Sequence, residues 1–259
     1  PASALSQVLI DSTELTAAGS ALGDGFGRSV AISGSTLVVG APGRDERGED
    51  SGAAYVFVRD ARGEWVQRQT LLAAELAPYD HFGWSVAIDG DLLVVGAPGD
   101  RRVAGVPDPL SPSRGAAYVF QRIDGWWRPM ARLQPDYLSA ADRFGWAVAA
   151  SGDAIAVAAP YRDLYSWQAD WGLVVVFRRT TSGWATEAEL TGWGGNAGSS
   201  VSLDGDDLAF GAPGYGYSRV HRWHRNPDGQ WTSWPAVEDR VDGLGSLARF
   251  GDARMLTRG

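Results

Sequence analysis

One pattern recurs along the chain and restricts its fold more than any other feature. Phe-Gly-x-Ser/Ala-Val-Ala is followed 14 residues later by Gly-Ala-Pro or a close copy, and then by a strand-like segment such as Ala-Tyr-Val-Phe. Copies start at Phe26, Phe82 and Phe144, and a degraded copy starts at Ala197. Internal repeats of this length are typical of solenoids, propellers and repeat arrays. Each period is long enough for one four-stranded unit.

The composition fits one large all-β domain and excludes several classes of function. The chain has 259 residues and a formal charge of −8, so it lacks the basic stripe that follows a phosphate backbone, and we expect no nucleic-acid partner. Cysteine is absent, which excludes disulfides and thiolate chemistry. The longest apolar runs, such as 173–177, are strand-sized, so we expect no membrane insertion. The first residues lack the pattern of a signal peptide.

Short β-branched segments divide each repeat into four predicted strands. In repeat 1 the first two strands are 29–32 and 36–39, and Ser33-Gly34-Ser35 between them is a tight-hairpin signal. The third strand covers 53–58, and the fourth opens at Trp65 and is partly polar, as expected of an outermost strand. The first two strands are mostly apolar and are predicted to lie inside. Equivalent third strands are 116–121, 173–178 and 219–224, and fourth strands open at Trp127, Trp184 and Trp231.

Four short strands per repeat predict a blade that packs face to face against its neighbours around an axis. This is the arrangement of a β-propeller. The chain shows no long window of helical periodicity, and a sandwich does not require such regular self-similarity. The Gly-Ala-Pro cluster supplies small side chains for close backbone approach, and its proline ends ladder pairing.

The Phe-Gly and Gly-Ala-Pro pairs, with Ala-Tyr-Val-Phe and a following Trp, resemble FG-GAP repeats. That family includes the N-terminal propeller of integrin α subunits and many bacterial surface proteins. The resemblance runs from about residue 23 to 259 and implies an adhesion or recognition role at the cell surface. Repeat 3 has Ala158-Ala159-Pro160 in place of Gly-Ala-Pro, and repeat 4 has lost the Phe, which puts the packing of blade 4 in question.

We expect one domain over residues 1–259, with repeats at approximately 24–79, 80–139, 142–191 and 195–241. A strand-4-like piece at 8–17 precedes them, and a partial fifth repeat, 248–259, follows them. These terminal fragments either close a ring of four or five blades or belong to a longer propeller, and the sequence leaves both readings open.

Calcium is a candidate cofactor, although the long Asp-rich loop between strands 1 and 2 of integrin-like propellers is here only a hairpin turn. The family's calcium residues therefore cannot be transferred. A different acidic set lies in the loop between strands 2 and 3, where oxygen ligands for calcium and a merely solvated loop are both compatible with the sequence. The candidate ligands are Asp45, Asp50, Asp163 and Asp170.

The chain contains 12 Trp residues, more than the blades require at about one per repeat. In a propeller, the loops before strand 1 and after strand 2 emerge on the same face, so the aromatic residues in these loops are expected to form one surface. Trp, Tyr and Arg are enriched at binding hot spots, and aromatic rings also stack on sugars. Packing between loops is the alternative. The candidate ligand-binding residues are Trp84, Trp146, Tyr161, Arg162, Tyr165, Trp167, Trp171, Tyr215 and Tyr217.

Asp24, Asp80 and Asp142 each stand two residues before the Phe or its copy. An Asp side chain that accepts backbone N–H groups in a turn explains this position without a ligand. We therefore assign these three residues a structural role.

The sequence gives little indication of catalysis. His221 and His224 are three residues apart on a predicted strand and point to opposite faces, which makes them a poor metal pair. No carboxylate spacing marks an acid and base pair. The sequence thus predicts a non-enzymatic, extracellular or cell-surface module that binds a protein or a glycan; a structural scaffold or a carbohydrate-active enzyme is the alternative.

Overall fold

The computed structural model describes residues 14–101, 113–139, 141–163, 170–193, 195–214 and 218–239. Within these residues the chain forms four antiparallel sheets of four strands each, and every sheet consists of four strands consecutive in sequence. The predicted all-β propeller architecture is confirmed, with one sheet per repeat. The terminal fragments 8–13 and 248–259 lie outside the described residues, so ring closure stays a prediction.

The strand bounds agree closely with the sequence prediction. Blade 1 consists of β1 (Ser29–Ser33), β2 (Thr36–Ala41), β3 (Ala53–Arg59) and β4 (Trp65–Leu71). Blade 2 consists of β5 (Ser85–Asp89), β6 (Leu92–Ala97), β7 (Ala116–Ile123) and β8 (Trp126–Leu133). Blade 3 consists of β9 (Ala147–Ser151), β10 (Ala154–Ala159), β11 (Leu173–Thr180) and β12 (Gly183–Leu190). Blade 4 consists of β13 (Ser200–Asp204), β14 (Asp207–Ala212), β15 (Ser218–Arg225) and β16 (Trp231–Asp239).

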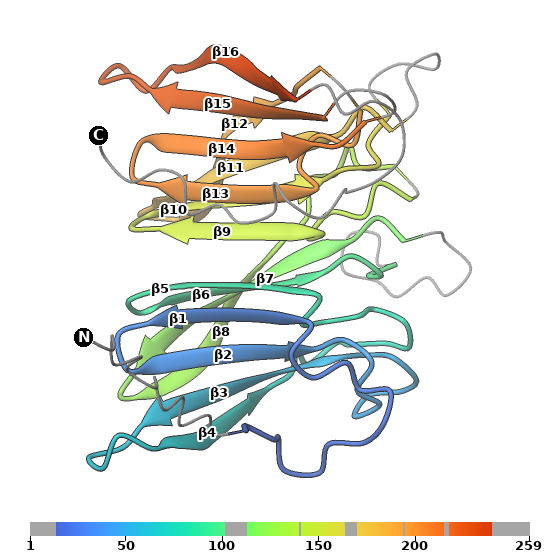
Figure 1. The fold of residues 1–259 in the computed structure, drawn as a ribbon, viewed down its shortest axis with the longest axis vertical. Coiled ribbons are helices and arrows are strands. Elements are labelled where there is room, and N and C mark those ends of the chain that lie inside the picture. The colour runs from blue at the N-terminus through green and yellow to red at the C-terminus, as the bar shows by residue number, and fades with distance from the viewer. Residues whose placement is uncertain are drawn as a thin grey trace, which may run out of the picture.

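The blades follow one another in chain order, from blade 1 at one end of the long axis to blade 4 at the other (Figure 1). The first strand of each blade is its inner edge, and β1, β5, β9 and β13 pack successively against one another. The hairpins between first and second strands carry the predicted glycines with a left-handed backbone; for example, φ is 57° at Gly34 and 56° at Gly90. A two-residue hairpin of this kind matches the twist of the flanking strands.

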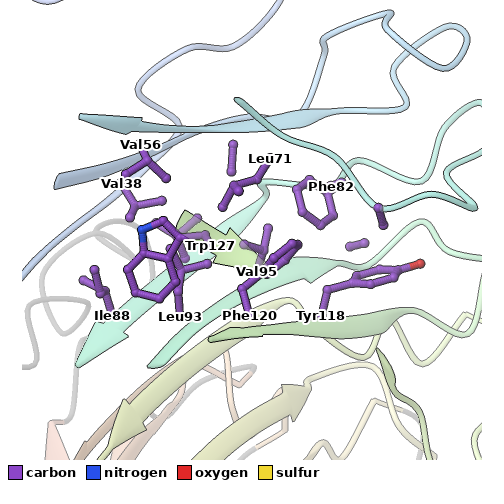
Figure 2. Close-up of a cluster of buried hydrophobic side chains, with 14 of the residues drawn as sticks. Val38, Val56, Leu71, Phe82, Ile88, Leu93, Val95, Tyr118, Phe120 and Trp127 are labelled. Carbon is purple, nitrogen blue, oxygen red and sulfur yellow. The ribbon is translucent and has the colours of Figure 1, made fainter. Parts of the chain in front are cut away.

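Each blade has two different faces, which we call the leading face, toward the preceding blade, and the trailing face, toward the following one. Leading faces carry large side chains; in blade 2 these are Ile88, Leu93, Phe120 and Trp127. Trailing faces carry smaller aliphatic side chains, such as Val38 in blade 1. Figure 2 shows how the two sets meet between blades 1 and 2. The same pairing of large on small recurs between blades 2 and 3 and between blades 3 and 4.

The Phe-Gly turn of one repeat docks on the Gly-Ala-Pro turn of the preceding repeat. A Cβ atom on Gly40 would overlap the carbonyl oxygen of Gly83, and one on Gly96 would overlap that of Gly145. The Ser29 hydroxyl donates to the same Gly83 carbonyl over 2.9 Å. The expected close backbone approach is therefore present, and it joins neighbouring blades.

Blade 4 packs on blade 3 although it has lost the aromatic residue of the Phe-Gly pair. Ala197 is fully buried and makes the same kind of parallel bridge, to Gly172, that Phe82 and Phe144 make to their preceding blades. Phe210 supplies an aromatic ring to this interface, at a strand position where repeats 1 to 3 have Val. Phe210 on β14 thus supplies to this interface the aromatic ring that repeat 4 lacks at Ala197.

The prediction that first strands lie inside is wrong in one respect. Val30 and Ile32 on β1 are 64% and 52% exposed, whereas the equivalent Val86 and Ile88 on β5 are each 9% exposed. The difference arises because blade 1 provides the trailing face that covers β5, while among the described residues no blade covers the leading face of β1.

A bulge in the outer strand directs one carboxylate from blade 3 toward blade 4. The β11–β12 register shifts after Val176, which leaves Glu187 as the extra residue on β12. Its carboxylate accepts hydrogen bonds from Arg178 over 3.0 Å, from Arg225 over 2.8 Å and from Trp231 over 3.3 Å. Burial by itself would raise the pKa of Glu187, but the hydrogen bonds from Arg178 and Arg225 outweigh it and lower this pKa.

Two isoleucines at the same position in successive repeats test the blade packing. We expect Ile88→Ala to lower the free energy of unfolding by about 2–4 kcal/mol because it leaves a cavity between blades 1 and 2. Ile32→Ala should cost less than about 1 kcal/mol because its side chain is already half in water. Denaturant unfolding measures both values. Equal losses of unfolding free energy in the two variants would contradict the exposed position of β1.

The lowered pKa of Glu187 predicts a specific pH dependence. Because the folded-state pKa lies below the unfolded-state value, the stabilisation is complete above the ordinary glutamate pKa and is lost as the pH falls through the folded-state pKa. We expect Glu187→Gln to cost about 1–3 kcal/mol at pH 7 and progressively less in acid. Thermal melts across this range measure the difference. Glu64→Gln, in an exposed turn, is the control and should leave the melting temperature unchanged at every pH.

Candidate functional site

The turns that lead into the inner strands have an unusual backbone. The residue directly before each Phe, or before Ala197, is left-handed: Gly25, His81, Arg143 and Asn196 have φ values from 53° to 67°. Gly adopts this conformation without cost, but His and Arg are strained there by about 1 kcal/mol each. Repeats 2 and 3 therefore present a cationic or titratable side chain at a position that repeat 1 fills with Gly25.

Buried carboxylates hold these entry turns in place. Asp24, Asp80 and Asp142 are almost fully buried and accept backbone N–H groups three residues earlier, from Ala21, Ala77 and Ser139 respectively, over 2.7–2.8 Å. This is the turn-stabilising role that the sequence predicted. Two of the carboxylates also receive an arginine, since Arg44 lies 3.1 Å from Asp24 and Arg162 lies 3.2 Å from Asp142.

Aromatic side chains from successive repeats meet above these turns. The ring centroids of Trp84 and Trp146 are 4.8 Å apart, and Trp146 meets the edge of Tyr161 at 5.4 Å. Arg28 covers the Trp84 ring with its guanidinium carbon 4.2 Å from the centroid, and Arg143 lies 5.0 Å from the Tyr161 centroid. We call these five residues the entry-turn ladder. It spans blades 1 to 3.

A cavity of about 320 Å³ opens beside the ladder and is called here the entry-turn pocket. It combines entry-turn residues with residues of the loop after β6, so the two kinds of loop share one face, as predicted. This face is the end of the blades at which β9 begins and β14 ends (Figure 1). The described lining residues are Tyr79, His81, Trp84, Pro98, Gly99, Arg101, Ser113, Arg143 and Trp146.

The charge of this lining differs from that of the whole chain. The net charge of the protein is −8, yet the described lining contains two arginines and a histidine and no carboxylate. The nearby carboxylates are engaged elsewhere: Glu49 accepts the Tyr79 hydroxyl, and Asp80 is buried in its turn. The pocket is thus a locally cationic and aromatic surface.

A buried ion pair supports the loop that forms one wall of the pocket. Asp100 is fully buried, and its carboxylate oxygens lie 3.0 and 3.1 Å from nitrogens of Arg132. The Tyr118 hydroxyl donates to the same carboxylate over 2.8 Å. Asp100 directly follows Gly99 and precedes Arg101, so this pair fixes the backbone on which two lining residues stand.

A second aromatic cluster lies where blade 3 connects to blade 4. Trp171 and Trp193 are 5.6 Å apart, and Trp193 is largely exposed beside a cavity of about 440 Å³. The ring Nε2 of His221 is 2.8 Å from the Trp193 carbonyl oxygen, and burial lowers the pKa of His221. Trp171 therefore contacts a different ring from those in the cluster of Trp84, Trp146 and Tyr161.

Of the remaining predicted ligand-binding residues, the structure describes Arg162 alone. Arg162 is committed to Asp142 and to the Ser139 hydroxyl, which gives it a supporting role beneath the turn. The other four, Tyr165, Trp167, Tyr215 and Tyr217, lie outside the described residues.

The candidate calcium residues occupy two similar loops but provide few ligands. Asp45 accepts the backbone N–H of Asp50, and Asp163 accepts that of Asp170, each over 2.8 Å. Each pair therefore closes its own turn with one carboxylate oxygen. Calcium takes six to eight oxygen ligands, and in the described part of the chain no group of three or more acidic or histidine side chains gathers at one point. Calcium binding stays a sequence prediction.

His221 and His224 are three residues apart in sequence but have separate surroundings. His221 packs on Phe210, while Nδ1 of His224 is 2.8 Å from a carboxylate oxygen of Asp207. Their side chains contact different residues, as the spacing predicted.

Sequence reasoning missed the entry-turn side chains that flank the two tryptophans. Arg28, His81 and Arg143 attracted no functional prediction because each is a single polar residue in a variable position. The available signal was positional: His81 and Arg143 each fill the x of Asp-x-Phe-Gly, where repeat 1 has Gly25. Only a comparison of the repeats with one another could have found it.

No helix in the part of the chain that the structure describes is long and apolar enough to cross a membrane.

Comparison with known proteins is consistent with the repeat pattern. The FG-GAP repeat family matches the chain over residues 11–57, 65–120 and 127–177, which together make up more than half of its length. No curated protein matches it significantly in sequence. Among solved structures it is similar to Saccharomyces cerevisiae Sqt1, with a TM-score of 0.43 and 10% identity, over 77% of this chain and 45% of the length of Sqt1.

The buried entry-turn carboxylates should contribute to stability. We expect Asp80→Ala to lower the free energy of unfolding by about 1–3 kcal/mol because it removes a buried carboxylate and leaves the Ala77 N–H without its acceptor. Denaturant unfolding measures the loss, and the exposed Asp136→Ala should stay within about 0.5 kcal/mol of the parent protein. Selective loss of ligand binding by Asp80→Ala at unchanged stability would contradict the structural role.

Proposed function

The chain belongs to the FG-GAP repeat family, and from that premise we propose that it is a non-enzymatic recognition module whose entry-turn ladder and pocket bind a protein or a glycan. The observation that carries the proposal is the contact of Trp84 with Trp146 beside an open pocket. Large aromatic and arginine side chains in a partly desolvated cleft are the usual anchors of a binding surface.

The ladder residues are not required for blade formation. The position after Phe-Gly is Trp84 in repeat 2 and Trp146 in repeat 3, but Arg28 in repeat 1 and Ser199 in repeat 4. All four repeats nevertheless form the same four-stranded sheet. An aromatic residue at this position therefore serves something other than the blade, which favours recognition over a purely structural scaffold.

The chemistry of the pocket favours binding over glycoside hydrolysis. Hydrolysis of a glycosidic bond ordinarily needs two carboxyl groups that flank the bond. The described lining of the entry-turn pocket offers arginine, histidine and aromatic side chains instead. An extracellular or cell-surface location and an adhesive role fit this proposal, because the sequence resembles propellers of that kind.

Substitution of the two ladder tryptophans tests the proposed function. The purified chain is applied to a glycan array and to a short-peptide array, and bound probes are titrated against variants. Serine is the replacement because repeat 4 carries Ser199 at this position. We expect the double variant Trp84→Ser, Trp146→Ser to bind at least tenfold more weakly, while its melting temperature stays nearly unchanged.

The matched control is Trp126→Ser, which removes a half-exposed tryptophan from the outer strand β8. This variant should bind like the parent protein. Equal affinity of the parent and the double variant for every bound probe would show that the ladder is only a packing contact between loops.

A further inference from the structure

Two arginines of the ladder are oriented by aromatic rings and not by carboxylates. Arg28 lies over Trp84, and Arg143 lies beside both Trp146 and Tyr161, 5.7 and 5.0 Å from their centroids. A guanidinium group that stacks through its flat face keeps its in-plane N–H donors directed outward. These ring contacts hold both guanidinium groups without using their N–H donors.

Several other arginines around the blades are instead paired with carboxylates. Arg44, Arg132 and Arg162 each form an ion pair with a carboxylate, as do Arg178 and Arg225. Neither Arg28 nor Arg143 forms an ion pair or a hydrogen bond within the described part of the chain. Both side chains are also exposed, so a ligand can reach their donors.

The backbone at Arg143 adds an independent observation. Its φ of 56° is strained for a residue with a side chain, and Gly25 shows that the fold accepts glycine at this position. His81 occupies the same strained position one repeat earlier and also lines the pocket. Local strain of this kind is retained where the side chain itself is needed. Here it directs the side chains of His81 and Arg143, from two adjacent turns, toward one cavity.

The sign of the ligand follows from the lining. A pocket with cationic side chains and no carboxylate among its described residues attracts an anionic group, and the positive edges of aromatic rings favour the same sign. A carboxylate matches the two parallel donors of a guanidinium group, which bind it in a bidentate manner. The pocket is therefore suited to a carboxylate.

Two features favour a peptide over an acidic polysaccharide. Arg28 covers the Trp84 face and Arg143 covers Trp146 and Tyr161, so these faces are already occupied where a sugar ring would stack. A long polyanion would also be repelled by a protein of net charge −8. A peptide with one or a few acidic side chains needs only the local cationic surface.

We propose that the entry-turn pocket and the ladder beside it bind a peptide segment bearing Asp or Glu, with Arg28 and Arg143 as the groups that pair with its carboxylates. This inference rests on the proposed recognition function and specifies its ligand. The pairing is partly exposed to solvent, so the affinity should fall as salt rises.

A peptide array with matched members tests the proposal. Each acidic peptide is paired with a copy in which Asp and Glu are replaced by Asn and Gln, and a neutral and an acidic glycan set are printed beside them. We expect hits among the acidic peptides, at least tenfold weaker binding of their amide copies, and loss of binding between about 0.05 M and 0.5 M salt.

Arginine variants locate the contact. Arg28→Gln and Arg143→Gln should each weaken binding about three- to tenfold. Arg68→Gln is the matched control, because Arg68 lies over Trp126 at 5.9 Å on the outer strands, away from the pocket. Arg143→Gly should weaken binding while the melting temperature stays the same or rises, since glycine relieves the strained φ. A purely structural role for Arg143 predicts the opposite pair of results.

The possible failures are distinguishable. Binding to amide copies or to glycans that is lost in the Trp84→Ser and Trp146→Ser variant would overturn the acidic-peptide inference and leave the recognition function standing. The absence of any hit that depends on these tryptophans would overturn both. Acidic-peptide binding that is equally weakened by Arg68→Gln would show a non-specific charge effect and overturn the inference.

Discussion

The contact on which the architecture depends is the docking of each Phe-Gly turn on the Gly-Ala-Pro turn of the preceding repeat. Gly40 and Gly96 have no room for a Cβ atom because the carbonyl oxygens of Gly83 and Gly145 lie against them. This close approach sets the distance between neighbouring blades and allows large leading-face side chains to pack on small trailing-face ones. The repeated motif is therefore an interface between repeats as much as a feature of one blade.

The same contact positions the candidate site. The entry turn of repeat 2 places Phe82 in the interface with blade 1 and Gly83 against Gly40. The same turn therefore determines the position of the next residue, Trp84. The equivalent turn of repeat 3 determines the place of Trp146, and the two rings meet because the two turns are held one blade apart. The structural residues of the turn and the exposed residues of the ladder thus alternate within a few positions of the chain. Stability and recognition can be changed separately by substitutions at neighbouring positions.

Variation between repeats, more than their similarity, indicates function in this chain. Repeat 4 lacks the Phe and repairs the interface with Phe210, so the blade contact is maintained when its motif is lost. The residue after Phe-Gly varies among Arg28, Trp84, Trp146 and Ser199 with no such repair, because this residue faces the loop surface. The residue directly before the Phe also varies between repeats, from Gly25 in repeat 1 to Arg143 in repeat 3. The variable positions of the entry turns form the candidate surface.

The sequence by itself determined the repeat, the four strands of each blade, the hairpins and the structural role of Asp80, because these depend on local periodicity and on turn chemistry within one repeat. It also indicated Trp84 and Trp146 as loop residues of one face. Only the tertiary structure decided that Arg28 of repeat 1 covers Trp84 of repeat 2, that the ring of Trp171 meets that of Trp193, and that Val30 and Ile32 are exposed. These features depend on which blade lies next to which among the described residues. A periodic pattern within one repeat does not encode contacts of that kind.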